Sequence, residues 1–325
     1  MAGSVLKKTV LAAVFVCVLL ASGCRSVGVR SDLPEVNPLS LLSDDSSIYI
    51  RVPVRFHQEL TAYILQAEEP ALSEKAAQQV VSRINLLYAG LATVKDRSRV
   101  QIAAQGSYPP VALKVALSKK NGWNRQQYVA LSSPEALSLN FPNTFDYYMH
   151  EGSEFELSFP SAEIFVTAKK VHPLLEQYAL RAEPADTEYN RWLSQQSDDI
   201  LFYITRPGQY LRNLIGQSVS IGCDAIYGSL QYAPGKDSPD SYSGIYTMSF
   251  NIALASESAM RPMKALLTLS MAMMDVEVSQ VDSRTLRLSG FRVSRQQIEA
   301  LFTREAITGK HFKVVKGEVI EESRK

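Results

Sequence analysis

The sequence predicts an α+β protein built from two similar repeats, each a mainly antiparallel sheet with helices packed on one face. Three observations predict this class. Short β-branched and aromatic runs alternate with stretches of helical apolar spacing. Hydrophobic residues make up 46% of the 325 residues, a fraction typical of a globular protein. Finally, three passages of the first half recur in the same order in the second half.

The first repeat is expected over residues 47–180. Ser47–Val54 reads as a strand, because it is β-branched and aromatic and Pro53 ends the run. A short helix around Leu60 follows. Ser73 then caps a long helix predicted over 73–95. Its apolar residues recur at steps of three and four, at Ala77, Val80, Val81, Ile84, Leu87, Tyr88 and Leu91.

The rest of the first repeat alternates between the two element types. A strand is predicted over 99–106, and Pro109-Pro110 opens a helix that runs to Lys119. Asn121-Gly122 stops this helix. Further strands are expected at 127–131, 136–141, 155–159 and 163–168, before a closing helix at 171–180.

The second repeat is expected over residues 197–304. The strand and proline at 48–53 recur at 201–207, the strand and helix at 100–119 recur at 246–274, and the strand before the last helix recurs at 286–290. The alternative interpretation is a chance likeness among α+β elements. The second copy lacks a long helix, and its place is taken by 216–242, which holds Pro234-Gly235 and a predicted loop.

The remaining boundaries follow from composition. Residues 181–196 form a connector, and 305–325 form a charged tail that ends in Glu-Glu-Ser-Arg-Lys and contains one predicted edge strand at 311–320. Residues 24–46 read as a tether between a membrane anchor and the body, because they are poor in large apolar groups and contain Pro34 and Pro38.

Residues 1–23 read as a secretion signal. Lys7 and Lys8 precede an uninterrupted apolar run, Val10–Leu20. As a helix this run is about 16 Å long at about 1.5 Å per residue, far short of the roughly 30 Å hydrocarbon core. A signal h-region therefore fits better than a membrane span. The small residues Ala21-Ser22-Gly23 then lead directly to Cys24.

Here the chain resembles bacterial lipoproteins, whose lipobox places a bulky apolar residue and small residues before a modified cysteine. Ala21 stands where leucine is usual, a looseness familiar among spirochaetal lipoproteins. The resemblance implies cleavage before Cys24, a diacylglycerol thioether on its sulfur and an acylated amine, such as a palmitate amide. In enterobacterial lipoproteins an aspartate after the cysteine retains the protein in the inner membrane; Arg25 stands there in this chain, which by that rule permits export to the outer membrane, and the sequence leaves the choice between inner and outer membrane open. The alternative is an ordinary secretory signal with Cys24 incidental.

Charge and cysteine content narrow the function classes. Removal of Lys7 and Lys8 changes the formal net charge from +1 to −1. No long basic stripe offers a footprint for phosphates, so nucleic-acid binding is disfavoured. Once Cys17 leaves and Cys24 takes lipid, only Cys223 remains, so the mature chain has no internal disulfide to form. Cys223 reads as a buried structural cysteine, because Asp224 opposes thiolate formation; the alternative is a reactive thiol.

Local motifs for catalysis are missing from the sequence. His57, His150, His172 and His311 do not form metal-ligand spacing, and there is no Cys-x-x-Cys or His-Glu-x-x-His. No nucleophile elbow and no glycine-rich phosphate loop occurs, and the one Ser-x-x-Lys lies inside the signal. The sequence therefore predicts no metal site, no cofactor and no catalytic residue, and it favours a protein that is not an enzyme.

Three patches are weighed as candidate sites. His150-Glu151 follows Phe145, Tyr147 and Tyr148; it reads as an acid–base pair beside aromatic platforms or, more plainly, as a strand whose aromatics face the core. The methionines between 260 and 274 read as core filling or as an adaptable binding surface. The turn at 106–110, with Trp123, reads as a groove edge or as an ordinary turn with a packed ring.

The sequence as a whole predicts a lipid-anchored envelope lipoprotein that binds or scaffolds. Its expected partners are a membrane, through lipid on Cys24, and an envelope protein or ligand at an aromatic and methionine-rich surface. One alternative is a hydrolase or transferase whose dispersed site includes His150, Glu151 or Cys223. Another is a carrier of an apolar molecule, which needs a cavity of several hundred Å³.

Overall fold

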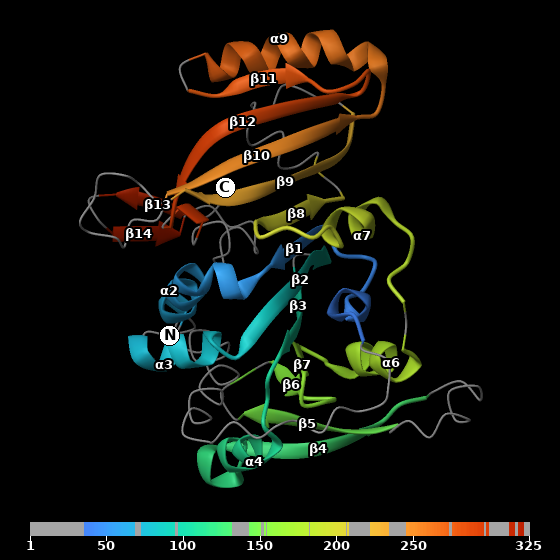
Figure 1. Cartoon of the computed structure of the whole chain (residues 1–325), viewed down its shortest axis with the longest axis vertical. Helices are drawn as coiled ribbons and strands as arrows, with labels where there is room; N and C mark the ends of the chain where they lie inside the picture. Colours follow the sequence, from blue (N-terminus) through green and yellow to red (C-terminus); the bar gives the residue numbers. More distant parts are fainter. Residues whose placement is uncertain are drawn as a thin grey trace. The chain divides into compact units, whose positions relative to one another are not determined.

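The structure is a computed structural model in which two compact units are described separately. Unit 1 comprises the described residues of Met1–Asp45, Arg51–Gly90 and Arg99–Ser194, and unit 2 those of Ser46–Ile50, Leu91–Ser98 and Gln195–Lys325. The described residues are 36–68, 73–94, 97–131, 143–150, 153, 155–181, 183–205, 207, 222–233, 245–272, 275–295, 297–298, 312–315 and 318–321. The predicted α+β class is confirmed: several helices accompany a large antiparallel sheet (Figure 1).

The strands that lie wholly or partly in unit 1 follow the order β1-β2-β3-β7-β6-β5-β4. The pairs from β3 outward to β4 are all antiparallel. The strands are β1 (Ile48–Val52), β2 (Ile84–Val94), β3 (Arg97–Gly106), β4 (Trp123–Val129), β5 (Thr144–His150), β6 (Glu156–Ser158) and β7 (Ile164–Ala168). The helices are η2 (Pro38–Leu41), η3 (Val54–Phe56), α2 (Gln58–Glu68), α3 (Glu74–Val81), α4 (Pro110–Ala116), η4 (Lys119–Asn121), α6 (His172–Leu180) and α7 (Glu188–Leu193).

The described part of the fold begins at Val36, eleven residues before the predicted start at Ser47. Residues 24–46 were expected to form a tether, but Val36, Leu39 and Leu41 are buried, and η2 packs against α6. The Asn37 side chain caps η2 by accepting the Leu39 N–H at 3.0 Å. The leucines of this short 3-10 turn, Leu39, Leu41 and Leu42, follow neither helical nor strand spacing. The sequence therefore reads as a linker here.

The long helix predicted over 73–95 is wrong beyond Val81. The helix α3 ends there, and β2 begins at Ile84 and runs to Val94. The apolar residues of this stretch fit both the alternation of a strand and the i, i+3, i+4 spacing of a helix. Periodicity alone could therefore not decide between the two. Gly90 and the β-branched Thr93 and Val94 disfavour a helix, and pairing within the sheet decides the outcome.

Helices cover both faces of the unit 1 sheet, which corrects the expectation of one covered face. Leu157 of β6 packs with Leu113 and Ala116 of α4 and with Trp123. The neighbouring Glu156 points the other way and accepts the Val171 N–H at the start of α6 at 2.9 Å. Because successive strand side chains alternate between faces, α4 and α6 lie on opposite sides of this sheet.

Unit 2 takes its main strands in the order β11-β12-β10-β9-β8, all antiparallel. The elements are β8 (Ile200–Ile204), β9 (Cys223–Ala233), β10 (Ile245–Leu254), η5 (Glu257–Ala259), α9 (Met260–Met271), β11 (Glu277–Gln280) and β12 (Thr285–Ser294). Buried side chains of α9 pack on one face of β10 and β12, against Ile252, Leu254, Leu286 and Leu288. The long strand β9 was not predicted, and it replaces part of the loop expected at 216–242.

The tail forms a second sheet rather than one edge strand. Strand β13 (Phe312–Val315) pairs antiparallel with β14 (Glu318–Glu321). The predicted strand at 136–141 lies outside the described residues, as do Leu301 and Phe302 of the helix expected to close the second repeat.

The two units share part of one order of elements. In unit 1, β3 leads into α4 and pairs with β7, which leads into α6. In unit 2, β10 leads into α9 and pairs with β12. These elements coincide with the second and third recurring passages of the sequence. The duplication itself stays a prediction, which superposition of the two units tests.

Candidate functional site

The β4–β5 strand pair carries the polar and aromatic residues singled out in the sequence. Its register pairs Trp123 with His150, Arg125 with Tyr148 and Tyr128 with Phe145. The alternation of a strand therefore sorts these residues onto two faces, one under α6 and one under α4. Each face has its own cluster, and the two clusters are built differently.

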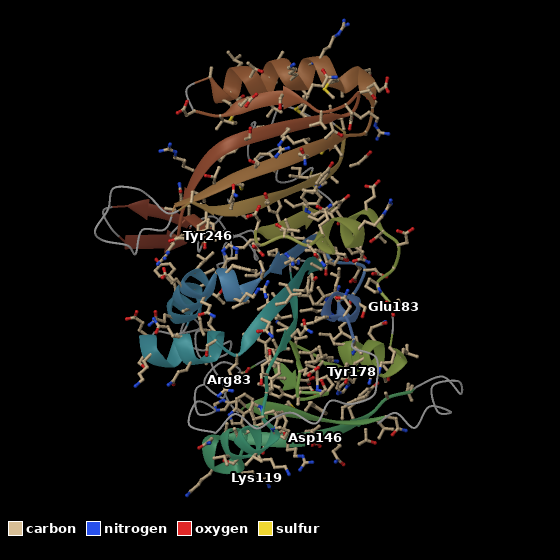
Figure 2. The ribbon with its side chains drawn as sticks, in the orientation of Figure 1. Arg83, Lys119, Asp146, Tyr178, Glu183 and Tyr246 are labelled. Atoms are coloured by element: carbon tan, nitrogen blue, oxygen red, sulfur yellow. The ribbon has the colours of Figure 1, made fainter. Side chains whose placement is uncertain are left out.

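The α6 face holds an aromatic cluster around His172, the first residue of that helix. The His172 ring stacks on Tyr128, with centroids 4.2 Å apart and planes 10° from parallel. Tyr147 meets the same ring edge-on at 5.0 Å. Phe145 packs edge-on against Tyr178 of α6 at 5.6 Å, and Figure 2 labels Tyr178. These contacts join β4 and β5 to α6 at mutually favourable ring angles.

Glu176, one turn after His172, fixes the end of β4 to α6. One of its carboxylate oxygens, Oε1, accepts the Tyr128 O–H and the Leu131 N–H, the latter at 2.8 Å. The hydrogen bond to Glu176 is the largest cause that raises the pKa of Tyr128 to about 12; burial and the negative charge of Glu176 act in the same direction. At neutral pH Tyr128 is protonated and donates to Glu176. The contact of Glu176 with Tyr128 and Leu131 therefore acts as a structural clasp between β4 and α6.

Tyr128→Phe is expected to lower the free energy of unfolding by about 1 kcal/mol, because a carboxylate loses one of two donors. Urea denaturation measures the loss, and Tyr232→Phe in unit 2 is the control. Because the pKa is raised in the folded state, the contribution is present below pH 10 and disappears as the pH rises toward 12. An unchanged urea midpoint for Tyr128→Phe at pH 7 would show that the hydrogen bond between Tyr128 and Glu176 does not stabilise the fold.

The α4 face holds a packed ring and an ion pair. His150 lies edge-on to Trp123 at 5.1 Å, and the left-handed Gly122 (φ 81°) leaves room for it, since a Cβ there would lie 2.8 Å from His150 Nε2. Asp146, labelled in Figure 2, pairs with Arg125 at 2.6 Å. The hydrogen bond and charge of Asp146 raise the pKa of Arg125.

The proposed acid–base pair at His150-Glu151 gains no support. His150 is packed against Trp123, and Glu151 lies outside the described residues. The aromatics beside it face the body of the protein: Phe145 is buried and Tyr148 is half-buried next to the α4 cluster. Burial is the largest cause that raises the pKa of Tyr148. The plainer interpretation, an aromatic strand packed on the core, holds for these residues.

The cluster of Tyr128, His172 and Glu176 was missed in the sequence. Tyr128 on β4 lies 44 positions before His172 and 48 before Glu176 on α6, so no local motif joins it to them. The usable signal was the i, i+4 spacing of His172 and Glu176, which places both on one side of a predicted helix.

Cys223 is a poor nucleophile in this structure. It is half-buried against the α9 core, and its S–H donates to the Ala225 carbonyl at 3.3 Å. Burial is the main cause that raises the pKa of the Cys223 thiol to about 12, and the charge of Asp224 adds to it. The predicted opposition of Asp224 to a thiolate agrees with this direction, and the geometry removes support for a catalytic role.

Alkylation of Cys223 by iodoacetamide at pH 8 is expected to be about a thousandfold slower than that of an exposed cysteine, whose pKa is about 8.5. A thiol with a pKa near 12 is almost wholly protonated at that pH. Timed labelling followed by mass measurement gives the rate, and the urea-unfolded protein serves as the control. Equal rates in the folded and unfolded states would show an accessible, reactive thiol.

The methionine-rich helix is a core element. Met260, Met263 and Met271 are buried in the α9 cluster, while Met273 and Met274 lie outside the described residues. The three buried residues are therefore not available as the binding surface that was one interpretation of this helix. Gly106-Pro110 forms a turn between β3 and α4, with Tyr108 buried, rather than an exposed groove edge.

The described residues contain no cluster of three or more metal-ligating side chains. Among the helices of the described chain, none has the length and apolarity needed to cross a membrane.

Comparison with known families decides the class of the protein. A family model described as "Outer membrane-associated lipoprotein TP0453" matches residues 34–299, most of the chain. The chain belongs to this family. The match begins two residues before Val36, where the described part of the chain starts with a buried side chain, and it covers most of both units. Membership of the TP0453 family assigns the protein to the cell envelope, in association with the outer membrane.

Solved structures of TP0453 share the fold. Crystal forms I and III each match with a TM-score of 0.57 and 15% identity, and crystal form IV with 0.57 and 14%. Each match covers 82% of this chain and 96%, 97% and 96% of the respective TP0453 chains. No curated protein sequence matches the chain significantly. At this identity, the likeness to TP0453 concerns the fold alone.

Cys24, the predicted lipidation site, lies outside both the described residues and the part matched by the TP0453 family model. Its modification stays a prediction from the lipobox.

Proposed function

We propose that the protein is anchored by lipid on Cys24 and that its folded body binds or scaffolds a partner in the envelope. The observation that carries the proposal is the agreement between two independent parts of the chain. Residues 19–24 end in a lipobox-like Leu-Leu-Ala-Ser-Gly-Cys, and the body at 34–299 belongs to a family of outer membrane-associated lipoproteins.

The chemistry of the described side chains supports binding over catalysis. The most suggestive titratable groups serve structural contacts: Glu176 holds Tyr128 and Leu131, Asp146 holds Arg125, and Cys223 is protonated. Carboxylates and a thiol that are engaged in structural contacts do not act on a substrate proton. These groups therefore give no support to acid–base catalysis.

The proposed binding surface is the outer edge of β4. This strand ends the order of unit 1 and pairs only with β5 among the described strands. Four consecutive side chains, those of residues 124–127, are exposed, and Val129 and Leu131 are 56% and 87% exposed. A terminal strand has one row of backbone N–H and C=O groups directed outward, so it can accept an extended segment of a partner protein.

Affinity capture from detergent-solubilised envelope tests this role with the acylated wild type and two edge variants, Gln126→Pro and Gln127→Pro. Adjacent strand residues direct their N–H groups to opposite sides, so one proline removes an outward donor and the other an inward one. The expected result is loss of the captured partner in the variant that keeps the wild-type melting temperature. Recovery of no partner and no envelope polymer, or capture unaffected by that variant, would refute the proposal.

A further inference from the structure

Asn121-Gly122 is a dipeptide with chemistry of its own, and it is the one Asn-Gly pair in the sequence. Because glycine has no side chain, its backbone nitrogen approaches the amide carbon of a preceding asparagine with little steric hindrance. When it attacks, a bond forms between Gly122 N and Asn121 Cγ, the bond from Cγ to the side-chain nitrogen breaks, and ammonia leaves with the proton of the Gly122 N–H. Water then opens the cyclic imide at either carbonyl, which gives aspartate or isoaspartate.

The structure places this dipeptide on the surface, where it closes the end of α4. The helix ends at Ala116, and its last carbonyls have no partner within the helix. The Asn121 side chain supplies one: Nδ2 donates to the Val115 carbonyl at 3.2 Å and to the Ala116 carbonyl at 3.0 Å. Asn121 is itself exposed, so water has access to its amide.

The same turn keeps the attacking nitrogen engaged. The Gly122 N–H donates to the Lys119 carbonyl at 3.0 Å, which closes η4, and Figure 2 labels Lys119. The flanking N–H groups of Asn121 and Trp123 donate to the Ser118 carbonyl at 2.9 Å and 3.3 Å. Attack on Cγ needs the Asn121 side chain and the Gly122 nitrogen to turn toward each other. Both are held by other partners, so the end of α4 must open before they react.

We propose that Asn121 is a modification site of this chain, and that local opening at the end of α4 admits it to spontaneous deamidation. Opening alone is reversible, because the same hydrogen bonds form again. Deamidation is not, because ammonia is lost. The closed turn is therefore stable only while the Asn121 amide is intact.

Deamidation removes the contacts that close the turn. A carboxylate at neutral pH has only acceptor atoms, so it donates to neither the Val115 nor the Ala116 carbonyl. Its charge also lies at the carboxyl end of a helix, where the helix dipole disfavours an anion. The adjacent Lys119 and Lys120 are exposed and offset part of this charge, but they do not replace the two hydrogen bonds to the helix.

Isoaspartate has a second effect, because it lengthens the backbone by one carbon atom. Gly122 has a φ of 81° and lies so close to the His150 ring that a Cβ on Gly122 would be 2.8 Å from Nε2. The backbone therefore does not shift toward His150 without moving this ring, which packs edge-on against Trp123, the first residue of β4. The modification loosens the point at which α4 leads into the exposed strand β4.

The rate of deamidation in the full chain tests whether the turn protects the amide. The protein is incubated at neutral pH, folded or in urea, and the amide, aspartate and isoaspartate forms of the peptide that contains Asn121 are separated by chromatography and identified by mass. The folded protein is expected to react at least about tenfold more slowly than the protein in urea. Equal rates would overturn the proposal.

Three variants test whether α4 is the element that opens. Lys114→Gly and Lys114→Ala remove the same charge from one exposed position of α4. Glycine is about 1 kcal/mol less favourable than alanine within a helix, so folded Lys114→Gly is expected to deamidate roughly fivefold faster than Lys114→Ala. Tyr128→Phe weakens unit 1 at α6 instead and should leave the wild-type rate unchanged. Equal rates or no reaction in both Lys114 variants, or a matching rise in Tyr128→Phe, would refute opening at α4.

Hydrogen exchange tests the consequence of the modification. The Leu117 N–H donates to the Leu113 carbonyl at 2.8 Å at the end of α4, so its exchange reports opening there. Asn121→Ala removes only the donor, whereas Asn121→Asp also introduces the charge of the product. Exchange is expected to be faster in Asn121→Ala than in the wild type, and about two- to fivefold faster again in Asn121→Asp. Exchange as slow in Asn121→Asp as in the wild type would show that deamidation leaves the turn closed, against the proposal.

Discussion

Cys24→Ala is expected to move the protein from the membrane fraction to the soluble fraction and to abolish labelling by radioactive palmitate. The physical reason is that two or three acyl chains give stable attachment, while even one gives only marginal binding of about 10⁴ M⁻¹. Among the described residues no helix offers a membrane span as a substitute. Fractionation after a high-pH wash measures the change.

The matched control for this experiment is Cys223→Ser, which removes the other cysteine of the mature chain. Cys223 is packed in unit 2 and is protonated, so this variant should keep both palmitate and membrane attachment. Persistent palmitate labelling of Cys24→Ala would refute the assignment of the lipid to this residue. Release of the Cys223→Ser variant would point to the wrong cysteine.

Leu157→Ala should produce a large loss of stability in unit 1. Leu157 is 0% exposed at the centre of the α4 cluster, where it packs with Leu113, Ala116 and Trp123. Removing its side chain loses the transfer free energy and leaves a cavity between α4 and the sheet, at a cost of about 2–5 kcal/mol. Urea denaturation followed by tryptophan fluorescence measures the change in the free energy of unfolding.

Val115→Ala on the same helix is the control. Its side chain is 66% exposed, so the truncation should change stability by less than about 0.5 kcal/mol. If Leu157→Ala costs no more than Val115→Ala, α4 does not pack on β6 as described. A large loss in both would instead show that the outer side of α4 is covered.

The parts of the fold that the sequence predicts correctly are those with one clear local pattern. The strand at β1 is bounded by Pro53, β7 is a short β-branched run, and α6 begins at His172 with proline at its second position. For β1 and α6 the pattern and a neighbouring proline indicate the same boundary, whereas β7 is indicated by its β-branched run alone. The internal repeat rests on such elements and is still to be tested.

The failures occur where two periods coincide or where burial is irregular. Ile84, Leu87, Tyr88 and Leu91 satisfy helical spacing, but they lie in β2 because strand pairing in the sheet outweighs a weak local preference. Val36–Leu42 are buried without a regular period, so no pattern separates them from a linker. Whether the second face of the unit 1 sheet is covered depends on the face on which α6 packs. This is decided by the tertiary fold and not by a local pattern.

The candidate site shows the same limit more sharply. His150 stands beside Glu151 in the sequence, yet in the structure its ring packs edge-on against Trp123. The clasp that joins β4 to α6 uses Tyr128, His172 and Glu176, which only the fold brings together. Local adjacency was a poor guide to chemistry here, whereas a short N-terminal signal read by processing enzymes is local by nature.

The most direct test of the account is the mass of the amino-terminal peptide of the mature protein, isolated from the cell envelope. The lipobox-like run at residues 19–24 predicts a mature chain that begins at Cys24, with diacylglycerol on its sulfur and an acyl group on its amine. A mature chain with a free, unmodified amino terminus, at Cys24 or elsewhere, would contradict it.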